Sequence, residues 1–258
     1  MSDSRATIVD RLLRGRLGPE AIAPLTEAEP ALSTAEAYEI QSDLERALTA
    51  LGDRVVGWKV GFSNAAVRES FGLDEPAAGF MLASGVYSSG DAVPCARFVS
   101  VGVEAEVAFL LKSELVGPGV TPASALLAIE GALPALELVD FRFSGKPRGS
   151  DMIADGVASN AVVLGHRLTA VAGIDLALEG LVFEQNGRLV ATNTAAEVMG
   201  NPLSSLAWLA NSLGRMGRRL SAGDLVLTGT ISKVLRPGAG DFARASFTRL
   251  GSVGCRFA

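Results

Sequence analysis

The stretch "GVEAEVAFLL" at residues 102–111 combines an apolar, strand-like sequence with two glutamates, Glu104 and Glu106. Residues at positions i and i+2 of a strand point to the same side, ~7 Å apart along the chain. Two uncompensated carboxylates on a buried face are energetically costly. The stretch therefore allows two alternatives: a half-exposed strand whose glutamates face solvent, or a buried site in which a partner neutralises them.

A third glutamate, Glu137, lies between leucines in a second strand-like segment, "PALELVDF" (134–141). Three carboxylates on apolar strands are best reconciled by a shared divalent cation, and hard oxygen ligands suit Mg²⁺ or Mn²⁺. Because Glu-x-Glu is a weak motif in isolation, spacing alone favours the solvated strand face over the metal site.

A lysine in an apolar setting is the second candidate for chemistry. Lys59 lies in "VVGWKVGF" (55–62) in a chain that has only four lysines. Partial burial would lower the pKa of Lys59 and suit it to binding a carboxylate or transferring a proton. A lysine that extends to solvent from a strand edge is an equal alternative. A third segment, "LTGTISKVLRPGAGD" (227–241), has glycines that let a ligand approach the backbone, but its spacing favours turns.

Composition excludes several classes of protein. The chain has 258 residues, of which 48% are hydrophobic, so it can bury a sizeable core. A net charge of −5 without a long basic run argues against binding to nucleic acid or to an anionic membrane. The sequence contains no apolar run of about 18 residues and its start lacks a signal-peptide core, which predicts a cytoplasmic protein without a membrane span.

Histidine and cysteine usage narrows the chemistry further. The single histidine, His166, rules out a His-rich metal site and is predicted to lie in a surface loop. Cys95 and Cys255 lack the spacing of a metal site, and we expect them to be reduced core residues.

The predicted fold is α+β, with helices first and strands later. Apolar residues at Ile8, Leu12 and Leu13 form one stripe of a helix, and Ser33 with Glu36 forms a capping-box pattern before a second helix. We expect a single domain over residues 1–258, in which a helical N-terminal cap (1–52) precedes a mixed, mostly antiparallel β body (53–258).

Several features of the body are predicted individually. A short helix is expected over residues 121–133, and an amphipathic helix over 204–220. Asn186-Gly187 between two strand-like runs predicts a type I′ hairpin. The irregular stretch 140–155 is interpreted as a functional loop or lid.

Taken together, the segments resemble the 2-keto-4-pentenoate hydratase family of the fumarylacetoacetase-like superfamily. The resemblance runs almost from end to end, through "AEAYEIQ", "GWKVGF", "LDEPAAG", "VEAEVAFLL", "PALELVD", "IADGVASNAVVLG", "NPLSSLAWLAN", "AGDLVLTG" and "GSVGCRF". It implies a β-roll body like the C-terminal domain of fumarylacetoacetase and an active-site Mg²⁺ or Mn²⁺.

The resemblance also implies roles for individual residues. The two glutamates of the family's E-x-E and the glutamate of its P-A-x-E would bind the metal, and the lysine of G-x-K-x-G would lie beside the substrate carboxylate or assist proton transfer. These are Glu104, Glu106, Glu137 and Lys59. Further contacts with the substrate are expected from Asp155, Ser159, Gly229 and Thr230.

Relatives of this kind act on 2-hydroxydienoates from aromatic meta-cleavage pathways, so the resemblance implies a hydro-lyase that adds water to a 2-hydroxy-dienoate or 2-oxo-enoate. Ala77 replaces an acidic residue of many hydratases, and residues 156–160 depart from the usual pattern. These departures leave two alternatives: a 4-oxalocrotonate-type decarboxylase, which works with a hydratase partner, and a non-catalytic metal- or ligand-binding paralogue. The family also implies a homo-oligomer, whereas C–C hydrolase activity is disfavoured because its histidine is missing.

Overall fold

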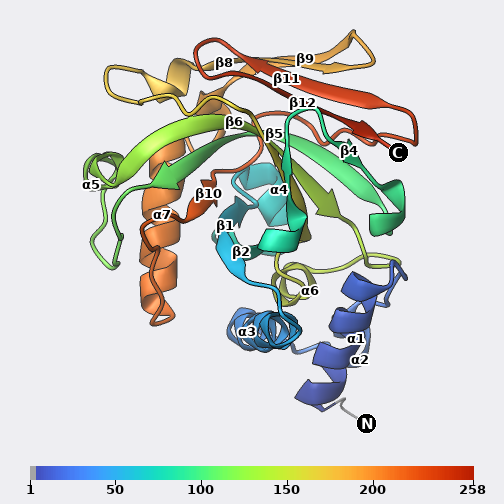
Figure 1. Ribbon diagram of the computed structural model, residues 1–258. Coiled ribbons are helices and arrows are strands. Elements are labelled where there is room, and N and C mark those ends of the chain that lie inside the picture. Colours follow the sequence, from blue (N-terminus) through green and yellow to red (C-terminus); the bar gives the residue numbers. More distant parts are fainter. Residues whose placement is uncertain (1–3) are drawn as a thin grey trace.

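Two curled β-sheets form the body of the protein, and the N-terminal helices lie below them (Figure 1). The structure is a computed structural model that describes residues 4–258. One sheet has seven strands in the order β2-β1-β10-β5-β6-β7-β3, and the other has five in the order β4-β12-β11-β8-β9. The strands are β1 (Val55–Gly61), β2 (Ala77–Leu82), β3 (Val86–Ser88), β4 (Ala92–Val93), β5 (Val101–Leu111), β6 (Ile129–Asp140), β7 (Ser159–Leu164), β8 (Gly180–Gln185), β9 (Arg188–Thr194), β10 (Leu225–Leu227), β11 (Phe242–Phe247) and β12 (Gly251–Phe257).

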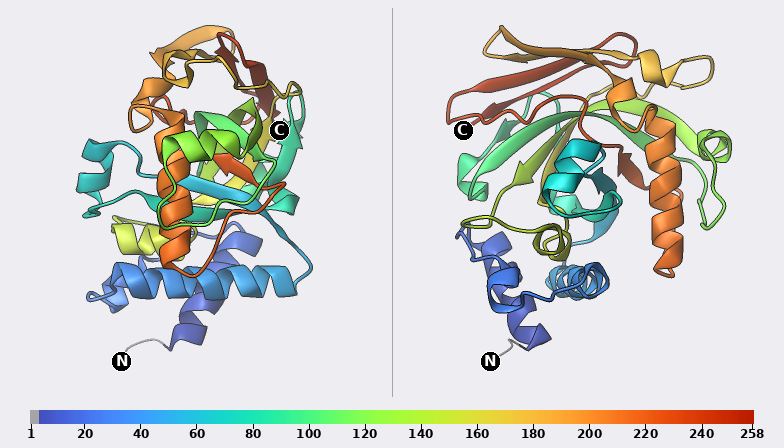
Figure 2. Two further views of the ribbon diagram at one scale, coloured as in Figure 1. Left: turned by 90° about the vertical axis from the view of Figure 1, so that its left-hand side faces the viewer. Right: turned by 180° about the vertical axis from the view of Figure 1, so that it is seen from behind.

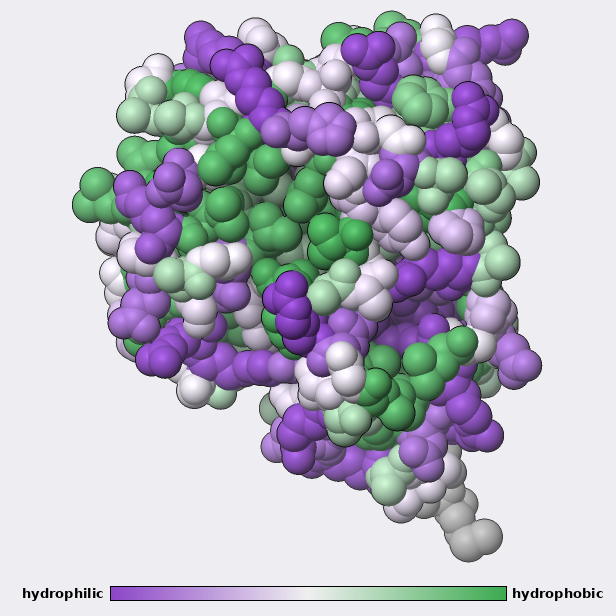
Figure 3. Space-filling view, in the orientation of Figure 1, coloured by the Kyte–Doolittle hydropathy of each residue, from purple (hydrophilic) through white to green (hydrophobic). Residues whose placement is uncertain are grey.

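Most neighbouring strands are antiparallel; the pairs β1–β10, β3–β7 and β4–β12 are parallel. The predicted mixed, mostly antiparallel body is thereby confirmed. In the further views the five-stranded sheet lies across the seven-stranded one, and helix α7 stands against the side of the body (Figure 2). In the space-filling view, hydrophobic residues gather in a hollow left of centre, at the level of β5 and β6 (Figure 3).

The helices of the N-terminal cap pack on the body through one continuous core. They are α1 (Arg5–Leu17), α2 (Leu25–Ala28) and α3 (Thr34–Ala50). Ser33 and Glu36 form the predicted capping box, and Ile8 and Leu12 are buried as the stripe predicted. The main hydrophobic cluster extends from α1 to Phe257 in β12. The boundary predicted at residues 52 and 53 falls in the turn between α3 and β1, and the division into cap and body stays a prediction.

Four further helices complete the fold: α4 (Ala65–Ser70), α5 (Pro122–Leu127), α6 (Gly149–Ala154) and α7 (Pro202–Arg215). The helix predicted over 121–133 was too long, because Ile129 already pairs with Leu111 of β5. The lid predicted over 140–155 is wrong in part, since all six residues of α6 are buried and α6 packs against α3.

Local turn predictions agree with the structure. Asn186 and Gly187 have φ values of 54° and 73° between β8 and β9, as a type I′ hairpin requires.

His166 is exposed, with its Nε2 atom 2.9 Å from the Ser89 carbonyl oxygen. Both cysteines are free; one of them, Cys255, is fully buried. Within residues 4–258, every helix is too short or too polar to cross a membrane.

Candidate metal and substrate site

The central hairpin of β5 and β6 brings the three glutamates together. Glu104 lies directly opposite Glu137 in the antiparallel register, and Glu106 lies two residues further along the same face of β5. One carboxylate oxygen from each of the three lies within 4.8 Å of the others. Glu106 and Glu137 are buried, with 1% and 0% of their surface exposed, whereas Glu104 is half-buried at a cavity. Burial therefore excludes the solvated strand face for Glu106 and Glu137.

The carboxylates have more acceptor capacity than the surrounding protein uses. Glu106 Oε2 accepts a hydrogen bond from the backbone N–H of Gly229 at 2.7 Å. Among the described residues, Glu106 Oε1 and both oxygens of Glu137 have no hydrogen-bond partner. Such orphaned oxygens in a dry site are costly unless a cation binds them. A cluster of oxygen-only donors suits a hard divalent ion.

Burial and mutual repulsion also shift the acidity of the cluster. Burial and the neighbouring Glu137 raise the pKa of Glu104 to about 7, although Lys59 acts in the opposite direction. Burial, together with the charges of Glu137 and Glu104, raises the pKa of Glu106 well above its usual range. The three carboxyl groups therefore resist full ionisation in the metal-free protein.

Lys59 approaches the cluster from β1. Its Nζ atom lies 3.2 Å from Glu137 Oε2, close enough for an ion pair although out of line for a hydrogen bond. It also donates a hydrogen bond to the carbonyl oxygen of Val157 at 3.2 Å. Burial opposes its charge, but attraction by Glu137, Glu104 and Glu106 raises the pKa of Lys59. The sequence-based expectation of a lowered pKa is therefore wrong for the metal-free protein, in which Lys59 is a buried ammonium whose charge the neighbouring carboxylates favour.

The glycines of the G-x-K-x-G segment make room for this lysine. A Cβ atom on Gly61 would lie 2.3 Å from Val157 Cγ1, and one on Gly57 would lie 1.9 Å from the Leu225 carbonyl oxygen. Both approaches are too close for any side chain. The spacing of the motif therefore follows from packing on both sides of Lys59.

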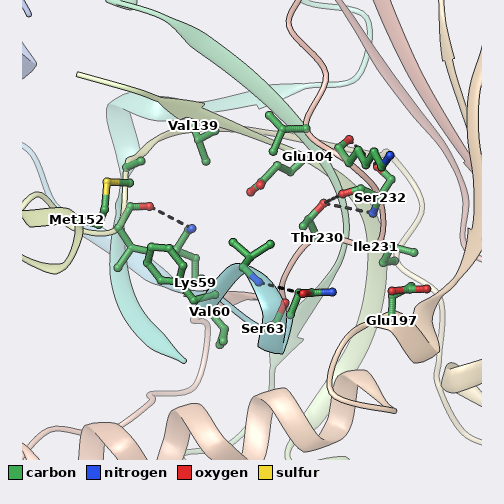
Figure 4. A pocket seen from close by; sticks show the side chains of 18 of the residues that line it. Lys59, Val60, Ser63, Glu104, Val139, Met152, Glu197, Thr230, Ile231 and Ser232 are labelled. Carbon is green, nitrogen blue, oxygen red and sulfur yellow. Dashed lines mark hydrogen bonds between the residues drawn. The ribbon is translucent and has the colours of Figure 1, made fainter. Parts of the chain in front are cut away.

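A cavity of ≈ 590 Å³ opens above the cluster. Lys59 and Glu104 extend into it from different walls, and Thr230, Ser232 and Glu197 border it on another side (Figure 4). Thr230 thus lies where a substrate contact was predicted. Gly229, also predicted, follows β10 and contacts Glu106 through its backbone N–H.

Two predicted substrate contacts lie elsewhere. Asp155 and Ser159 are buried and are not among the residues that line the cavity. Asp155 forms ion pairs with Arg16 and with Arg142. The carbonyl oxygen of Ser159 accepts a hydrogen bond from Arg142 at 3.1 Å. In this structure Asp155 and Ser159 hold Arg16 and Arg142 and do not border the cavity, and their contact with a substrate stays a prediction.

The fully buried Arg142 escaped sequence reasoning, because one arginine in "DFRF" carries no signal of burial. Its guanidinium also lies 3.2 Å from Asp140 Oδ2. Three residues that line the cavity, Phe62, Val157 and Ala158, have φ values of 58°, 58° and 57°. Non-glycine residues in this region are strained, and such strain is concentrated at functional sites.

Comparison with known proteins identifies relatives of this chain. Residues 56–258 match the family described as "Fumarylacetoacetate (FAA) hydrolase C-terminal". The chain is 36% identical to a 2-hydroxypent-2,4-dienoate hydratase from Pseudomonas putida, over 81% of this chain and 95% of the relative. It is 35% identical to a 2-keto-4-pentenoate hydratase from Burkholderia vietnamiensis, over 100% and 99%. The solved structure of 4-oxalocrotonate decarboxylase from Pseudomonas putida G7, complexed with magnesium and adipate, superimposes with a TM-score of 0.96 at 30% identity, covering 98% of this chain and 97% of the other.

Proposed function

Since the chain belongs to the fumarylacetoacetate hydrolase C-terminal family, we propose that it is a lyase of the 2-keto-4-pentenoate hydratase type. Its reaction is the addition of water to a 2-hydroxy-dienoate or 2-oxo-enoate in the degradation of aromatic compounds. The observation that carries the proposal is the buried cluster of three glutamates beside Lys59, at the end of a cavity large enough for such an acid.

The glutamates Glu104, Glu106 and Glu137 would hold Mg²⁺ or Mn²⁺. The buried oxygens of Glu106 and Glu137 that lack a hydrogen-bond partner fit a divalent cation, because they are hard anionic ligands. When bound, such an ion supplies Lewis-acid stabilisation of the negative charge that develops on an enolate.

Lys59 and the cavity walls position the substrate. The charged ammonium binds the substrate carboxylate, and the Val157 carbonyl and Glu137 fix its position. Thr230 lies in the cavity wall and Gly229 orients the Glu106 carboxylate from behind. Because Lys59 is buried and pre-positioned, little side-chain entropy is lost when the substrate binds.

The 4-oxalocrotonate-type decarboxylase is the second candidate, supported by the close superposition on that enzyme and by Ala77, which is fully buried in β2.

Purified protein with Mg²⁺ should be incubated with 2-hydroxypenta-2,4-dienoate and, separately, with 2-oxohex-3-enedioate. Loss of dienol ultraviolet absorbance without CO₂ supports the hydratase, whereas CO₂ release from the six-carbon diacid supports the decarboxylase. A protein that binds metal but turns over neither substrate would be a ligand-binding paralogue.

We also propose a homo-oligomer. Large apolar side chains remain exposed on the single chain, including Leu127 at 75%, Leu178 at 69% and Leu189 at 64%. Exposed apolar surface of this kind marks contacts between proteins when it forms a continuous patch. Light scattering coupled to size-exclusion chromatography measures the oligomeric state directly, and a monomer at high protein concentration would contradict the proposal.

A further inference from the structure

We propose that the cavity beyond Lys59 and Glu104 is a subsite for an uncharged apolar tail, so that the substrates are monocarboxylic 2-oxo or 2-hydroxy-dienoic acids with an alkyl or aryl group at the far end. The inference rests on the proposed function, because the 2-oxo acid end is what brings the tail into the cavity. It concerns the larger part of the cavity, which the metal cluster and the lysine do not use.

Apolar side chains from separate parts of the chain converge on this part of the cavity. Phe62 follows β1, Phe71 ends α4, Val139 lies in β6, Met152 in α6 and Val234 in the segment after β10. Together they belong to a distinct hydrophobic cluster, and the two phenyl rings lie 5.0 Å apart. Figure 4 shows Met152 and Val139 bordering the same space as Lys59. An apolar surface assembled from so many elements is a built feature of the fold.

Three of the neutral polar side chains in the wall, Asn193, Thr230 and Ser232, donate hydrogen bonds within the protein. The side-chain amide of Asn193 donates to the carbonyl oxygen of Ile231 at 2.8 Å. The hydroxyl of Thr230 donates to the carbonyl oxygen of Ser232 at 2.8 Å, and the hydroxyl of Ser232 donates to that of Lys233 at 3.2 Å. These donors are therefore committed before a ligand arrives.

The cavity also lacks a buried cation for a second carboxylate. Among the described lining residues, the charged ones besides Lys59 and Glu104 are Glu197 and Lys233, which have opposite charges and are both exposed. Of two nearby arginines, Arg68 donates to the Phe62 carbonyl and Arg236 lies over a phenyl ring 3.7 Å from its centroid. A carboxylate placed among the phenyl rings would lose its water without gaining a partner.

The size of the cavity exceeds the needs of a five-carbon acid. Its volume of ≈ 590 Å³ lies within the range of roughly 300–1,000 Å³ that is typical of sites for drug-sized ligands. Each additional methylene group buried there should tighten binding roughly fourfold. A longer apolar tail thus gains affinity that a short substrate cannot obtain.

Isothermal titration calorimetry of the full chain, in a buffer that contains Mg²⁺, tests the tail subsite without requiring turnover. Saturated 2-oxo acids serve as probes: 2-oxopentanoate, 2-oxooctanoate, 2-oxohexanoate and its diacid counterpart 2-oxoadipate. We expect the eight-carbon acid to bind about tenfold or more tightly than the five-carbon acid, and the diacid about tenfold more weakly than 2-oxohexanoate. Affinities independent of chain length, or a preference for the diacid, would overturn the tail subsite alone. If none of the 2-oxo acids binds, the proposed function itself fails.

A charge placed in the subsite should reverse the preference. Phe71→Arg is expected to tighten binding of 2-oxoadipate and weaken that of 2-oxooctanoate, each by about tenfold. Leu51→Arg, in the exposed turn after α3, is the matched control and should bind all four probes like the natural chain. If Phe71→Arg does not fold by circular dichroism, Val67→Arg at the exposed edge of the cavity replaces it. Unchanged preferences in the folded variant contradict the proposal.

The N-terminal helices hold the backbone next to Lys59, and we infer that Arg16 is a positioning residue for this lysine. Thr26, the second residue of α2, donates two hydrogen bonds to the carboxylate of Asp151, one from its backbone N–H at 2.8 Å and one from its hydroxyl at 2.7 Å. Gln41 of α3 donates to the carbonyl oxygen of Ile153 at 2.7 Å. Each of the three cap helices therefore contacts the segment 151–155, and α1 does so through Arg16.

Arg16 makes the contact nearest to the strained turn. Its Nε atom lies 3.3 Å from Asp155 Oδ1, and its side chain is 7% exposed. The next residues, Gly156 and Val157, have φ values of 68° and 58°. A β-branched residue holds such a conformation only when its surroundings fix it. The Val157 carbonyl, which accepts from Lys59, thus depends on an anchor supplied by the cap.

The variant Arg16→Gln tests this role against Arg14→Gln, an exposed arginine on the same helix. We expect Arg16→Gln to lower kcat about tenfold or more while Mg²⁺ affinity stays nearly unchanged, because a small displacement of Lys59 impairs substrate positioning. Modification of Lys59 by an amine-reactive reagent, followed by mass spectrometry, should become faster, and Arg16→Lys should restore both readouts in part. This labelling does not depend on the proposed reaction.

If Arg16→Gln folds and has the same kcat and the same labelling rate as Arg14→Gln, the inference is overturned. If Arg16→Gln unfolds, Thr26→Val removes the hydroxyl donor to Asp151 and should show the same pattern more weakly. Unchanged kcat and labelling in Thr26→Val would then be the contradicting result.

Discussion

Without divalent metal, the free energy of unfolding should decrease as the pH rises. The pKa shift of Glu104 gives the size of this decrease. Burial and the neighbouring Glu137 raise its pKa from 4.5 to about 7. A carboxyl group whose pKa is raised by folding binds its proton more tightly in the folded state. The stability that this contributes is fully present below pH 4.5 and is lost as the pH rises through about 7.

At 1.36 kcal/mol per pH unit, the loss amounts to about 3 kcal/mol. For a domain of this size, 1 kcal/mol corresponds to a change in Tm of roughly 2–4 °C, so the expected fall is roughly 6–12 °C. Glu106 adds to the same trend, because burial and repulsion raise its pKa as well. Mg²⁺ or Mn²⁺ at about 100 times its Kd should return about 2.7 kcal/mol at the higher pH.

Thermal unfolding followed by circular dichroism at about pH 5 and about pH 8 measures this fall in Tm. The protein is measured once with a chelator and once with added metal. Glu104→Gln should remove about 3 kcal/mol of the pH dependence of the metal-free protein and leave the part that Glu106 contributes. Glu130→Gln, an exposed glutamate in β6, is the matched control and should keep it. The reasoning is refuted if the metal-free natural chain has the same Tm at both pH values, or if Glu104→Gln behaves like the control.

Three further predictions follow from the same geometry. Glu106→Gln should abolish Mn²⁺ binding in calorimetry while leaving the far-ultraviolet spectrum unchanged; unaltered affinity would exclude Glu106 as a ligand. Lys59→Met should lower kcat/KM about a hundredfold while changing Mn²⁺ affinity far less, and equal losses of both would indicate a purely structural lysine. Gly61→Ala should lower the free energy of unfolding by about 1–3 kcal/mol in denaturant titrations, because its Cβ atom would overlap Val157; a neutral effect would mean that the turn at Val157 yields easily.

The elements that the sequence predicts well are those whose signals are local. The Ser33–Glu36 capping box and the Asn186-Gly187 turn each depend on residues within one turn of the chain, and both are found as predicted. The start of β6 was misplaced because residues 129–133 have helical character but gain a partner strand in β5. Pairing between strands is decided by residues distant in sequence, which local patterns do not contain.

The same distinction applies to the site. Spacing alone left Glu104 and Glu106 on a solvated strand, and only the resemblance to a family favoured a metal cluster. Asp155 was expected to contact the substrate. Its carboxylate instead forms ion pairs with Arg16 of α1 and with Arg142, which follows β6. Burial of an arginine depends on the tertiary fold, and a lone arginine in the sequence gives no indication of it.

The charges of the cluster explain why such a costly arrangement persists. When fully ionised, the three carboxylates face one ammonium, so Lys59 alone would leave two negative charges uncompensated in a buried site, and this cost helps to raise the pKa values of Glu104 and Glu106 in the metal-free protein. One divalent cation removes this excess, and the cluster with Lys59 and the metal becomes neutral as a whole. A singly charged 2-oxo acid then enters a site that no longer repels anions, whereas the metal-free site repels it to the extent that its carboxyl groups are ionised and offers it no cation besides Lys59. Metal should therefore be required for the substrate to bind as well as to react, and 2-oxopentanoate titrated into chelator-treated protein should give no measurable heat. Binding of equal strength with and without metal would show that Lys59 alone recruits the carboxylate.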